Sequence, residues 1–217
     1  MTGIQRYSPV TFESSIKESE VRDNWKIVLA YQNEGSGPWL VDLGHKTRWD
    51  LQDSQIDDPS RSEFSVPSSP GTCFFSEKKL INRMNRTQAA IWHLGMEETI
   101  IPDFKEFTDV TESTAFLSLF GPDAFHVAEK LTALDLMDPD RTTPFLLQGP
   151  LCHVPCQIVI LERYADMSGG IIMTCSRGYA ESMVQAILDS GREFGLRPAG
   201  ETRFSDWVRK IQDQTSN

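Results

Sequence analysis

The sequence predicts an α+β fold in which helices cover one face of a β-sheet. Two observations in the second half of the chain support this class. Short apolar runs bounded by glycine, proline or polar residues are typical of buried strands, and two longer segments carry apolar residues at helical spacing. In chain order they give a strand, a helix, three strands and a second helix. A chain of 217 residues is long enough to bury a core around such a sheet.

The individual elements have recognisable boundaries. The predicted strands are residues 113–121, 143–149, 156–164 and 169–175. The first predicted helix covers residues 121–136, and Pro122 stands at its first position, where a missing N–H costs nothing. The second covers residues 176–195, and Gly195 suits the left-handed conformation that ends a helix. A final amphipathic segment carries Phe204, Trp207, Val208 and Ile211.

The first half of the chain is less regular. We predict that residues 1–105 form an irregular N-terminal extension for interactions, ahead of an α+β domain at residues 106–217. Residues 26–32 have the apolar content of a short strand. Residues 45–72 are rich in serine, proline and aspartate, which predicts a long loop. Residues 77–95 place apolar side chains on a rough helical face, so a helix is expected there.

The chain is acidic, with a formal net charge of −10 at pH 7. Nonspecific binding to nucleic acid or to anionic membranes needs clustered positive charge, so we expect neither partner. No apolar run approaches the ~20 residues that span a bilayer, and residues 1–15 lack the apolar core of a secretory signal. The four cysteines match no disulfide scaffold. We therefore expect a soluble protein of the reducing cytoplasm.

The motif CHVPC brings Cys152, His153 and Cys156 close together, and soft metal ions bind such ligands. A structural zinc site needs a fourth ligand, however, and Cys175 is the only other cysteine in this half of the chain. Strand alternation places Cys156 on the same face as Ile158, which favours burial as a small apolar side chain. We expect a core or turn role for these residues and assign no metal.

Tryptophan and arginine side chains are typical anchors of protein interfaces. The segment HKTRWD lies in the predicted loop, and we expect it to contact a partner; a ligand site and a solvated loop are the alternatives. The predicted interface residues are Trp39, His45, Arg48, Trp49, Trp92 and Trp207.

Three arginines are candidate contacts for an anionic cofactor. Arg83 and Arg86 lie three residues apart and would share a helix face, where paired guanidinium groups clamp a carboxylate. Arg197 flanks the turn after the last regular helix, together with Arg203. A solvated face is the alternative explanation for the first pair. The sequence shows no hydrolase triad order, P-loop or dinucleotide-binding glycine motif, so we assign no catalytic residue.

Two segments carry a family resemblance. The stretch DVTESTAFLSLFGPDAFHVAEKLTALDL, which begins at Asp109, is similar to a strand and helix of the glycine-cleavage T-protein family, the aminomethyltransferases. The stretch SGREFGLRPAG, which begins at Ser190, resembles the end of a later helix in that family. The resemblance covers about residues 109–210. It implies a ferredoxin-like α+β domain of the folate-binding type, with tetrahydrofolate as its cofactor.

Some members of this family are small γ subunits of multi-subunit enzymes that oxidise N-methylated amines, such as heterotetrameric sarcosine oxidase. Two phrases of the N-terminal half, PWLVDLGHKTRWDLQD and LINRMNRTQAAIWHL, resemble the small subunit of dimethylamine monooxygenase. This resemblance implies larger catalytic and reductase partner subunits that carry haem, flavin or iron–sulfur centres. The methyl group would leave as formaldehyde, which tetrahydrofolate traps.

The sequence departs from the family at its acidic residues. Pro155 and Cys156 stand where the resemblance implies acids, and the segment RYADMSGGIIM lacks the folate-contacting glutamate. Because aminomethyl transfer needs a carboxylate, we expect a γ-type subunit that is not catalytic alone. Two alternatives stay open. One is a stand-alone tetrahydrofolate-dependent one-carbon transferase that uses Asp166 or Glu162, and the other is a regulatory module that binds folate.

Overall fold

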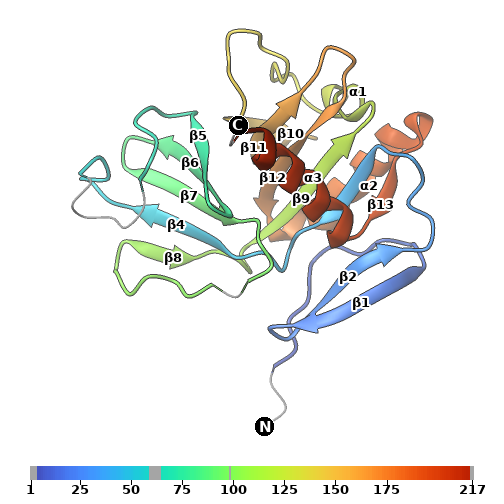
Figure 1. Cartoon of the computed structure of the whole chain (residues 1–217), viewed down its shortest axis with the longest axis horizontal. Helices are drawn as coiled ribbons and strands as arrows, with labels where there is room; N and C mark the ends of the chain where they lie inside the picture. The colour runs from blue at the N-terminus through green and yellow to red at the C-terminus, as the bar shows by residue number, and fades with distance from the viewer. Residues whose placement is uncertain (1–3, 59–64, 98, 216–217) are drawn as a thin grey trace.

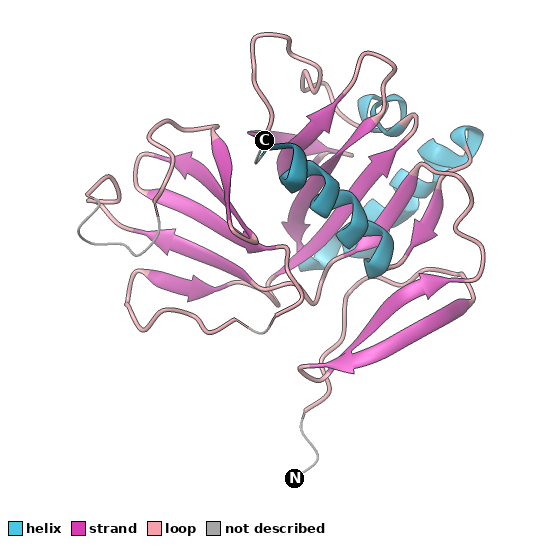
Figure 2. Cartoon of the chain, in the orientation of Figure 1, coloured by secondary structure: helices cyan, strands magenta, loops and turns pink. Residues whose placement is uncertain are grey.

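The computed structural model describes residues 4–58, 65–97 and 99–215. Strands dominate the structure and form three sheets, and helices pack on both faces of the largest sheet (Figure 1; Figure 2). The predicted α+β class is confirmed. Among the residues that the structure describes, no helix combines the length and apolar character that crossing a bilayer requires.

The largest sheet contains all four strands predicted in the second half of the chain. In spatial order its strands are β10 (Phe145–Leu151), β11 (Val154–Arg163), β12 (Gly169–Ser176), β9 (Thr114–Gly121), β3 (Trp39–Asp42) and β13 (Arg197–Ala199). Neighbours pair antiparallel except β13 and β3, which are parallel. Since β3 comes from the first half of the chain, the two halves share one sheet. The division at residue 105 stays a prediction.

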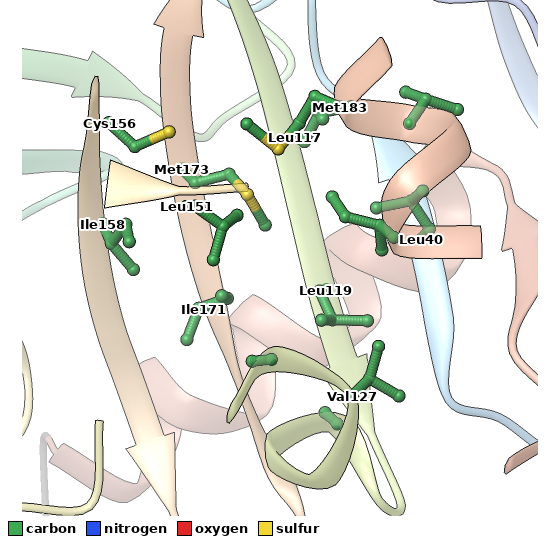
Figure 3. Packing of buried hydrophobic residues seen from close by; sticks show 14 of the residues in the cluster. Leu40, Leu117, Leu119, Val127, Leu151, Cys156, Ile158, Ile171, Met173 and Met183 are labelled. Carbon is green, nitrogen blue, oxygen red and sulfur yellow. The ribbon is translucent and has the colours of Figure 1, made fainter. Parts of the chain in front are cut away.

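Strand β9 is buried on both faces and divides the core into two layers. Leu117 and Leu119 pack against helices α1 (Ala124–Glu129) and α2 (Ala180–Gly191) in the first layer (Figure 3). Phe116 and Phe120 point to the other layer, which also holds the apolar face of helix α3 (Glu201–Thr215). Each such fully buried side chain contributes about 1.5–3 kcal/mol of hydrophobic stabilisation.

The two helices predicted in the second half of the chain are confirmed, but the first is shorter than predicted at both ends. It begins at Ala124, so Pro122 lies in the turn before it and not at its first position, and it ends at Glu129 and not at residue 136. The second consists of α2 flanked by two short 3₁₀ turns, Arg177–Tyr179 and Arg192–Phe194. Gly195 adopts the expected left-handed conformation, with a φ of 74°. The final amphipathic segment forms α3, and it buries Phe204, Val208 and Ile211.

A second sheet of five strands occupies the region between β3 and β9. Its spatial order is β5 (Cys73–Ser76), β6 (Lys79–Asn85), β7 (Gln88–His93), β4 (Arg48–Gln52) and β8 (Phe107–Asp109). The helix predicted at residues 77–95 is wrong, because this segment is the β6–β7 hairpin. Both strands are buried on both faces, so their residues lack the alternation that distinguishes a strand from a helix.

The long polar segment at residues 45–72 is only partly a loop. Strand β4 lies within it and pairs with β7 on one side and with the edge strand β8 on the other. Residues 59–64 of this segment lie outside the described residues.

The N-terminal hairpin consists of β1 (Ile16–Arg22) and β2 (Trp25–Tyr31), which confirms the strand expected at residues 26–32. The turn residues Asp23 and Asn24 both have positive φ, as the common two-residue hairpin turn requires. Strand β1 is almost fully exposed, whereas β2 buries Trp25, Ile27 and Tyr31 beneath it. The hairpin therefore covers part of the molecule rather than belonging to either larger sheet.

A buried carboxylate joins this hairpin to the rest of the fold. Glu201 begins α3, and its side chain is 1% exposed. Lys46 donates to Glu201 Oε1, His45 Nε2 lies 3.0 Å from the same oxygen, and Arg22 Nη2 donates to Oε2 at 2.9 Å. Burial opposes ionisation of Glu201, but His45, Lys46 and Arg22 outweigh it and hold the pKa of this carboxyl well below its usual range.

Glu201→Gln is expected to destabilise the protein by about 3–5 kcal/mol, because it leaves the buried Lys46 without a full counter-charge. Urea denaturation at pH 7 measures the loss. Glu20→Gln is the matched control, since Glu20 pairs with the same Arg22 but is 42% exposed. Its loss should stay below about 1 kcal/mol. Equal losses in the free energy of unfolding for the two variants would show that the buried Glu201 cluster stabilises the protein no more than an exposed ion pair does.

A candidate ligand-binding cleft

A cleft of about 1010 Å³ opens at one end of the six-stranded sheet. Six parts of the chain line it: Lys17 of β1, residues 29–35 at the end of β2 and after it, Trp39 of β3, the end of β9, the β11–β12 turn and helix α3. Its walls thus come from segments that are distant in the sequence, and α3 contributes one whole side.

Glu34 is held rigidly on one side of the cleft. Its Oε1 accepts from the backbone amides of Tyr31 at 3.0 Å and Gly200 at 2.9 Å, and its Oε2 accepts from Arg203 Nε at 2.7 Å. Burial raises the cost of charging Glu34, but these three donors outweigh it and lower the pKa of the carboxyl. Glu34 is therefore a fixed negative charge at pH 7.

Glu162 is the second carboxylate of the cleft and lies near the end of β11. Trp207 Nε1 donates to its Oε1, and the Tyr164 hydroxyl donates to its Oε2 at 2.8 Å. The hydrogen bond to this carboxylate raises the pKa of Tyr164. Each oxygen of Glu162 keeps a further lone pair, so the group can accept another hydrogen bond from a ligand.

An aromatic wall runs along the cleft. The rings of Phe120 and Trp207 are stacked, with centroids 4.5 Å apart and an angle of 8° between their planes. Trp39 packs on the other side of Phe120 at 5.5 Å, and the Arg203 guanidinium lies 4.5 Å from the Trp39 ring. Phe120 itself is 1% exposed, so the half-buried Trp207 and Trp39 rings provide the flat apolar surface for a planar ligand.

Two glycines allow the tryptophans to lie so close to the sheet. A Cβ atom on Gly170 would come within 2.7 Å of the Trp207 ring. A Cβ atom on Gly121 would lie 2.7 Å from the Trp39 ring, and this glycine has a φ of 103° that other residues rarely adopt. The aromatic wall therefore depends on small residues beneath it.

The cleft combines a planar apolar wall with carboxylates and cations. Lys17, Lys210 and Arg203 supply the positive charge, and the described lining residues include no cysteine or histidine. The lining also carries five acidic side chains, Glu34, Asp123, Glu162, Asp166 and Asp206. Such a site suits a planar molecule that bears N–H donors.

Two of the predicted interface residues, Trp39 and Trp207, line this cleft and are half-buried. His45 lies beside Glu201 in the buried charge cluster. These three residues stay predictions as partner contacts.

The other predicted interface residues require correction, because the fold itself uses them. Arg48 is buried, and it donates to Thr114 Oγ1 at 3.0 Å and to the Lys46 carbonyl at 2.6 Å. Burial lowers the pKa of Arg48 to about 9. Trp49 and Trp92 are also buried in the core. Their side chains leave no exposed area for a partner.

The three predicted cofactor-binding arginines do not converge. Arg83 is buried on β6, where it donates to the carbonyl oxygens of Asn85 and Arg86, both at 2.6 Å. Arg86 is exposed in the β6–β7 turn, and Arg197 is exposed on β13. The expected shared helix face is absent because the segment is a hairpin. None of the three arginines lines the cleft.

Cys152 and His153 form the turn between β10 and β11, with φ angles of 51° and 65°. Cys156 is buried opposite Cys175 on the neighbouring strand. These are the turn and core positions expected for them. Within the described part of the chain, no group of three or more histidine, cysteine, aspartate or glutamate side chains could hold a metal ion.

The sequence pointed to Glu162, Asp166 and Arg203 for different reasons and gave no sign that they lie close together in space. It gave no indication of a role for Glu34. The structure places all four around the cleft. Glu34 precedes a Gly-Ser-Gly-Pro turn, which is a signal for a loop but not for a contact with residues more than 160 positions away.

No protein-family model matches the chain. The aminomethyltransferase of Geobacillus thermodenitrificans is 32% identical over 95 residues, which are 44% of this chain and 25% of that protein. The aminomethyltransferase of Saccharopolyspora erythraea is 30% identical over 126 residues, which are 57% of this chain and 33% of that protein. The chain thus matches between a quarter and a third of the length of these relatives.

Two solved structures share the fold. A chain of heterotetrameric sarcosine oxidase from Corynebacterium sp. U-96, solved in complex with pyrrole 2-carboxylate, aligns with a TM-score of 0.58 at 14% identity over 74% of this chain and 88% of that chain. The glycine cleavage system aminomethyltransferase T from Bartonella henselae aligns with a TM-score of 0.51 at 12% identity over 87% of this chain and 57% of that chain. The predicted T-protein-like α+β fold is confirmed.

Gly170→Ala is expected to destabilise the protein by about 1–3 kcal/mol, because the added methyl group must displace Trp207 or Phe120. Thermal unfolding followed by near-ultraviolet circular dichroism measures both the stability and the aromatic packing. Gly178→Ala is the matched control, since nothing lies within 4 Å of its added Cβ atom. It should change stability by no more than about 0.5 kcal/mol. An unchanged aromatic spectrum in the Gly170 variant would contradict the packing described.

Proposed function

We propose that this chain is a γ-type subunit of a multi-subunit oxidoreductase that oxidatively demethylates N-methylated amines. The observation that carries the proposal is the extent of the fold likeness. The chain covers 88% of one chain of a heterotetrameric oxidase but only 57% of aminomethyltransferase T. It therefore corresponds in extent to one subunit of an assembled oxidase. Dimethylamine is the proposed substrate of the complex, which would then be a dimethylamine monooxygenase.

In this proposal the redox chemistry belongs to larger catalytic and reductase subunits, which carry haem, flavin or iron–sulfur centres. Trp39, His45 and Trp207 are the proposed contacts with them, because each keeps part of its surface exposed.

Tetrahydrofolate is the proposed ligand of the cleft, and the residues present fit it. The volume of about 1010 Å³ and the half-buried Trp39 and Trp207 rings suit a planar heterocycle. Glu162 would accept from its N–H edge, and Lys17 and Lys210 would attract its anionic tail. Bound tetrahydrofolate supplies a nitrogen that captures formaldehyde. The chain's own residues would hold and orient it.

The subunit proposal is tested by expressing the chain with its genomic neighbours, purifying it through a tag, and recording native mass spectra. We expect a stoichiometric complex with subunits that carry haem, flavin or iron–sulfur centres. A chain that purifies as a lone monomer beside expressed, folded neighbours would refute the proposal.

The folate proposal is tested by titrating the purified chain or complex with tetrahydrofolate and following tryptophan fluorescence. Glu162→Gln should weaken binding by roughly tenfold or more, because it removes a charged hydrogen-bond acceptor. Glu181→Gln, an exposed position on α2 outside the cleft, should leave the affinity unchanged. Equal affinities for the two variants, or the absence of binding to the wild type, would contradict this assignment of the cleft.

A stand-alone tetrahydrofolate-dependent one-carbon transferase is the second candidate. The identity to two aminomethyltransferases favours it, as does the presence of Glu162 and Asp166 in the cleft. Tetrahydrofolate-dependent turnover by the isolated chain would support this candidate, and its absence from a chain that binds folate would eliminate it. Tight folate binding without turnover or any partner would instead favour the regulatory module.

A further inference from the structure

A second cavity of about 250 Å³ lies beneath the N-terminal hairpin. Its walls come from Arg6, the β1–β2 hairpin, the β3–β4 loop and the start of β4, the end of β7 with the described residues that follow it, and the end of β8 with Thr111. It shares no lining residue with the cleft described above, so the two are separate sites. The inference drawn from it does not depend on the proposed function.

Two aromatic side chains that line this cavity carry ring nitrogens without a hydrogen-bond partner. Trp25 is 3% exposed and His93 is 5% exposed. Within the described residues, neither Trp25 Nε1 nor His93 Nε2 has a partner. An indole N–H can only donate, and leaving a buried donor unpaired is unfavourable. A ligand with an acceptor oxygen would remove this deficit.

The ring of His93 is neutral at pH 7. Burial lowers its pKa to about 4. The backbone amide of His93 donates to the Thr47 carbonyl at 2.9 Å, and its ring lies edge-on to Trp49 at 4.2 Å between centroids. The ring is therefore held in place, and because it is neutral only one of its two nitrogens carries a proton.

The charges around the cavity balance. The lining contains three basic side chains, Arg6, Arg22 and Lys46, and three acidic ones, Asp23, Glu97 and Asp109. The basic groups already have partners: Arg6 pairs with Asp23 and Glu112, and Lys46 and Arg22 pair with Glu201. A ligand that brought a net charge would lack a free counter-charge, which disfavours its burial.

We propose that this cavity binds a small, uncharged, planar molecule whose carbonyl oxygen accepts the indole proton of Trp25. The side chains of Trp49, Ile27 and Ile101 supply the apolar surface for its body, because the Arg6 guanidinium already covers a face of Trp25 at 4.7 Å. Aromatic amides and ketones belong to this class.

The experiment uses nitrogen-15 NMR, since the chain has five tryptophans and each indole N–H gives one resonance. Benzamide is the probe, titrated to about tens of millimolar, where a fragment of this size binds. We expect the Trp25 indole proton to shift downfield as it gains an acceptor. Trp25→Phe assigns the resonance and should weaken benzamide binding about tenfold or more, since the N–H donor and the pyrrole half of the indole are both lost.

Trp207→Phe is the matched control, because Trp207 lies in the other cleft; it should leave the benzamide-dependent shift of the Trp25 indole proton unchanged. Benzoate, which has the same shape but a negative charge, should bind more weakly than benzamide. Tighter binding of benzoate would overturn the inference of an uncharged ligand. A wild-type spectrum in which no indole resonance assigned to Trp25 responds to benzamide would overturn the site itself. If Trp25→Phe does not fold, the Trp25 resonance can still be assigned. Trp207→Phe and the other single tryptophan-to-phenylalanine variants assign the remaining indole resonances and leave that of Trp25 by elimination. The wild-type titration with benzamide then decides the question.

Discussion

The buried carboxylate of Glu201 is the contact on which both sites depend. It begins α3, and its three basic partners come from β1 and from the loop between β3 and β4. Helix α3 supplies Arg203 and Trp207 to the cleft, while Arg22, His45 and Lys46 line the second cavity. One ionised group therefore fixes a wall of each site. Burying it is tolerable because three cationic or polar groups converge on its two oxygens.

Strand β9 is the second constraint, since it is buried on both faces. Alternation sends Leu117 and Leu119 toward α1 and α2 and sends Phe116 and Phe120 toward α3. Phe120 then stacks on Trp207 where the strand ends at the cleft. The same alternation that builds the core thus places an aromatic ring at the edge of a binding surface, and Gly121 and Gly170 leave room for the tryptophans beside it.

The second half of the fold was predictable from the sequence because each helix or strand there keeps a single apolar spacing along its length. Strands β9 to β12 and helix α2 have apolar patterns that agree with their environments. Residues 77–95 fail for a physical reason: Asn82, Arg83 and His93 are buried in a two-sided hairpin, so polarity no longer marks exposure. Because this segment is a hairpin, Arg83 is buried on β6 while Arg86 is exposed in the turn, so the two arginines do not share the face that helical spacing predicted. The cleft needs contacts such as Glu34 to Gly200, which no local pattern encodes.

Glu34 and Glu162, two of the carboxylates of the cleft, differ in what they are free to do. Glu34 accepts from the amide of Gly200, just before α3, and from Arg203 in its first turn, where the helix dipole also favours negative charge. With its pKa lowered, it is a poor proton carrier near neutrality. Glu162 faces the aromatic wall and takes its hydrogen bonds from Trp207 and Tyr164 alone among the described side chains. With Glu34 as a pinned charge and Glu162 as an acceptor beside the aromatic wall, this pair of carboxylates is better arranged to hold a planar ligand than to move its protons.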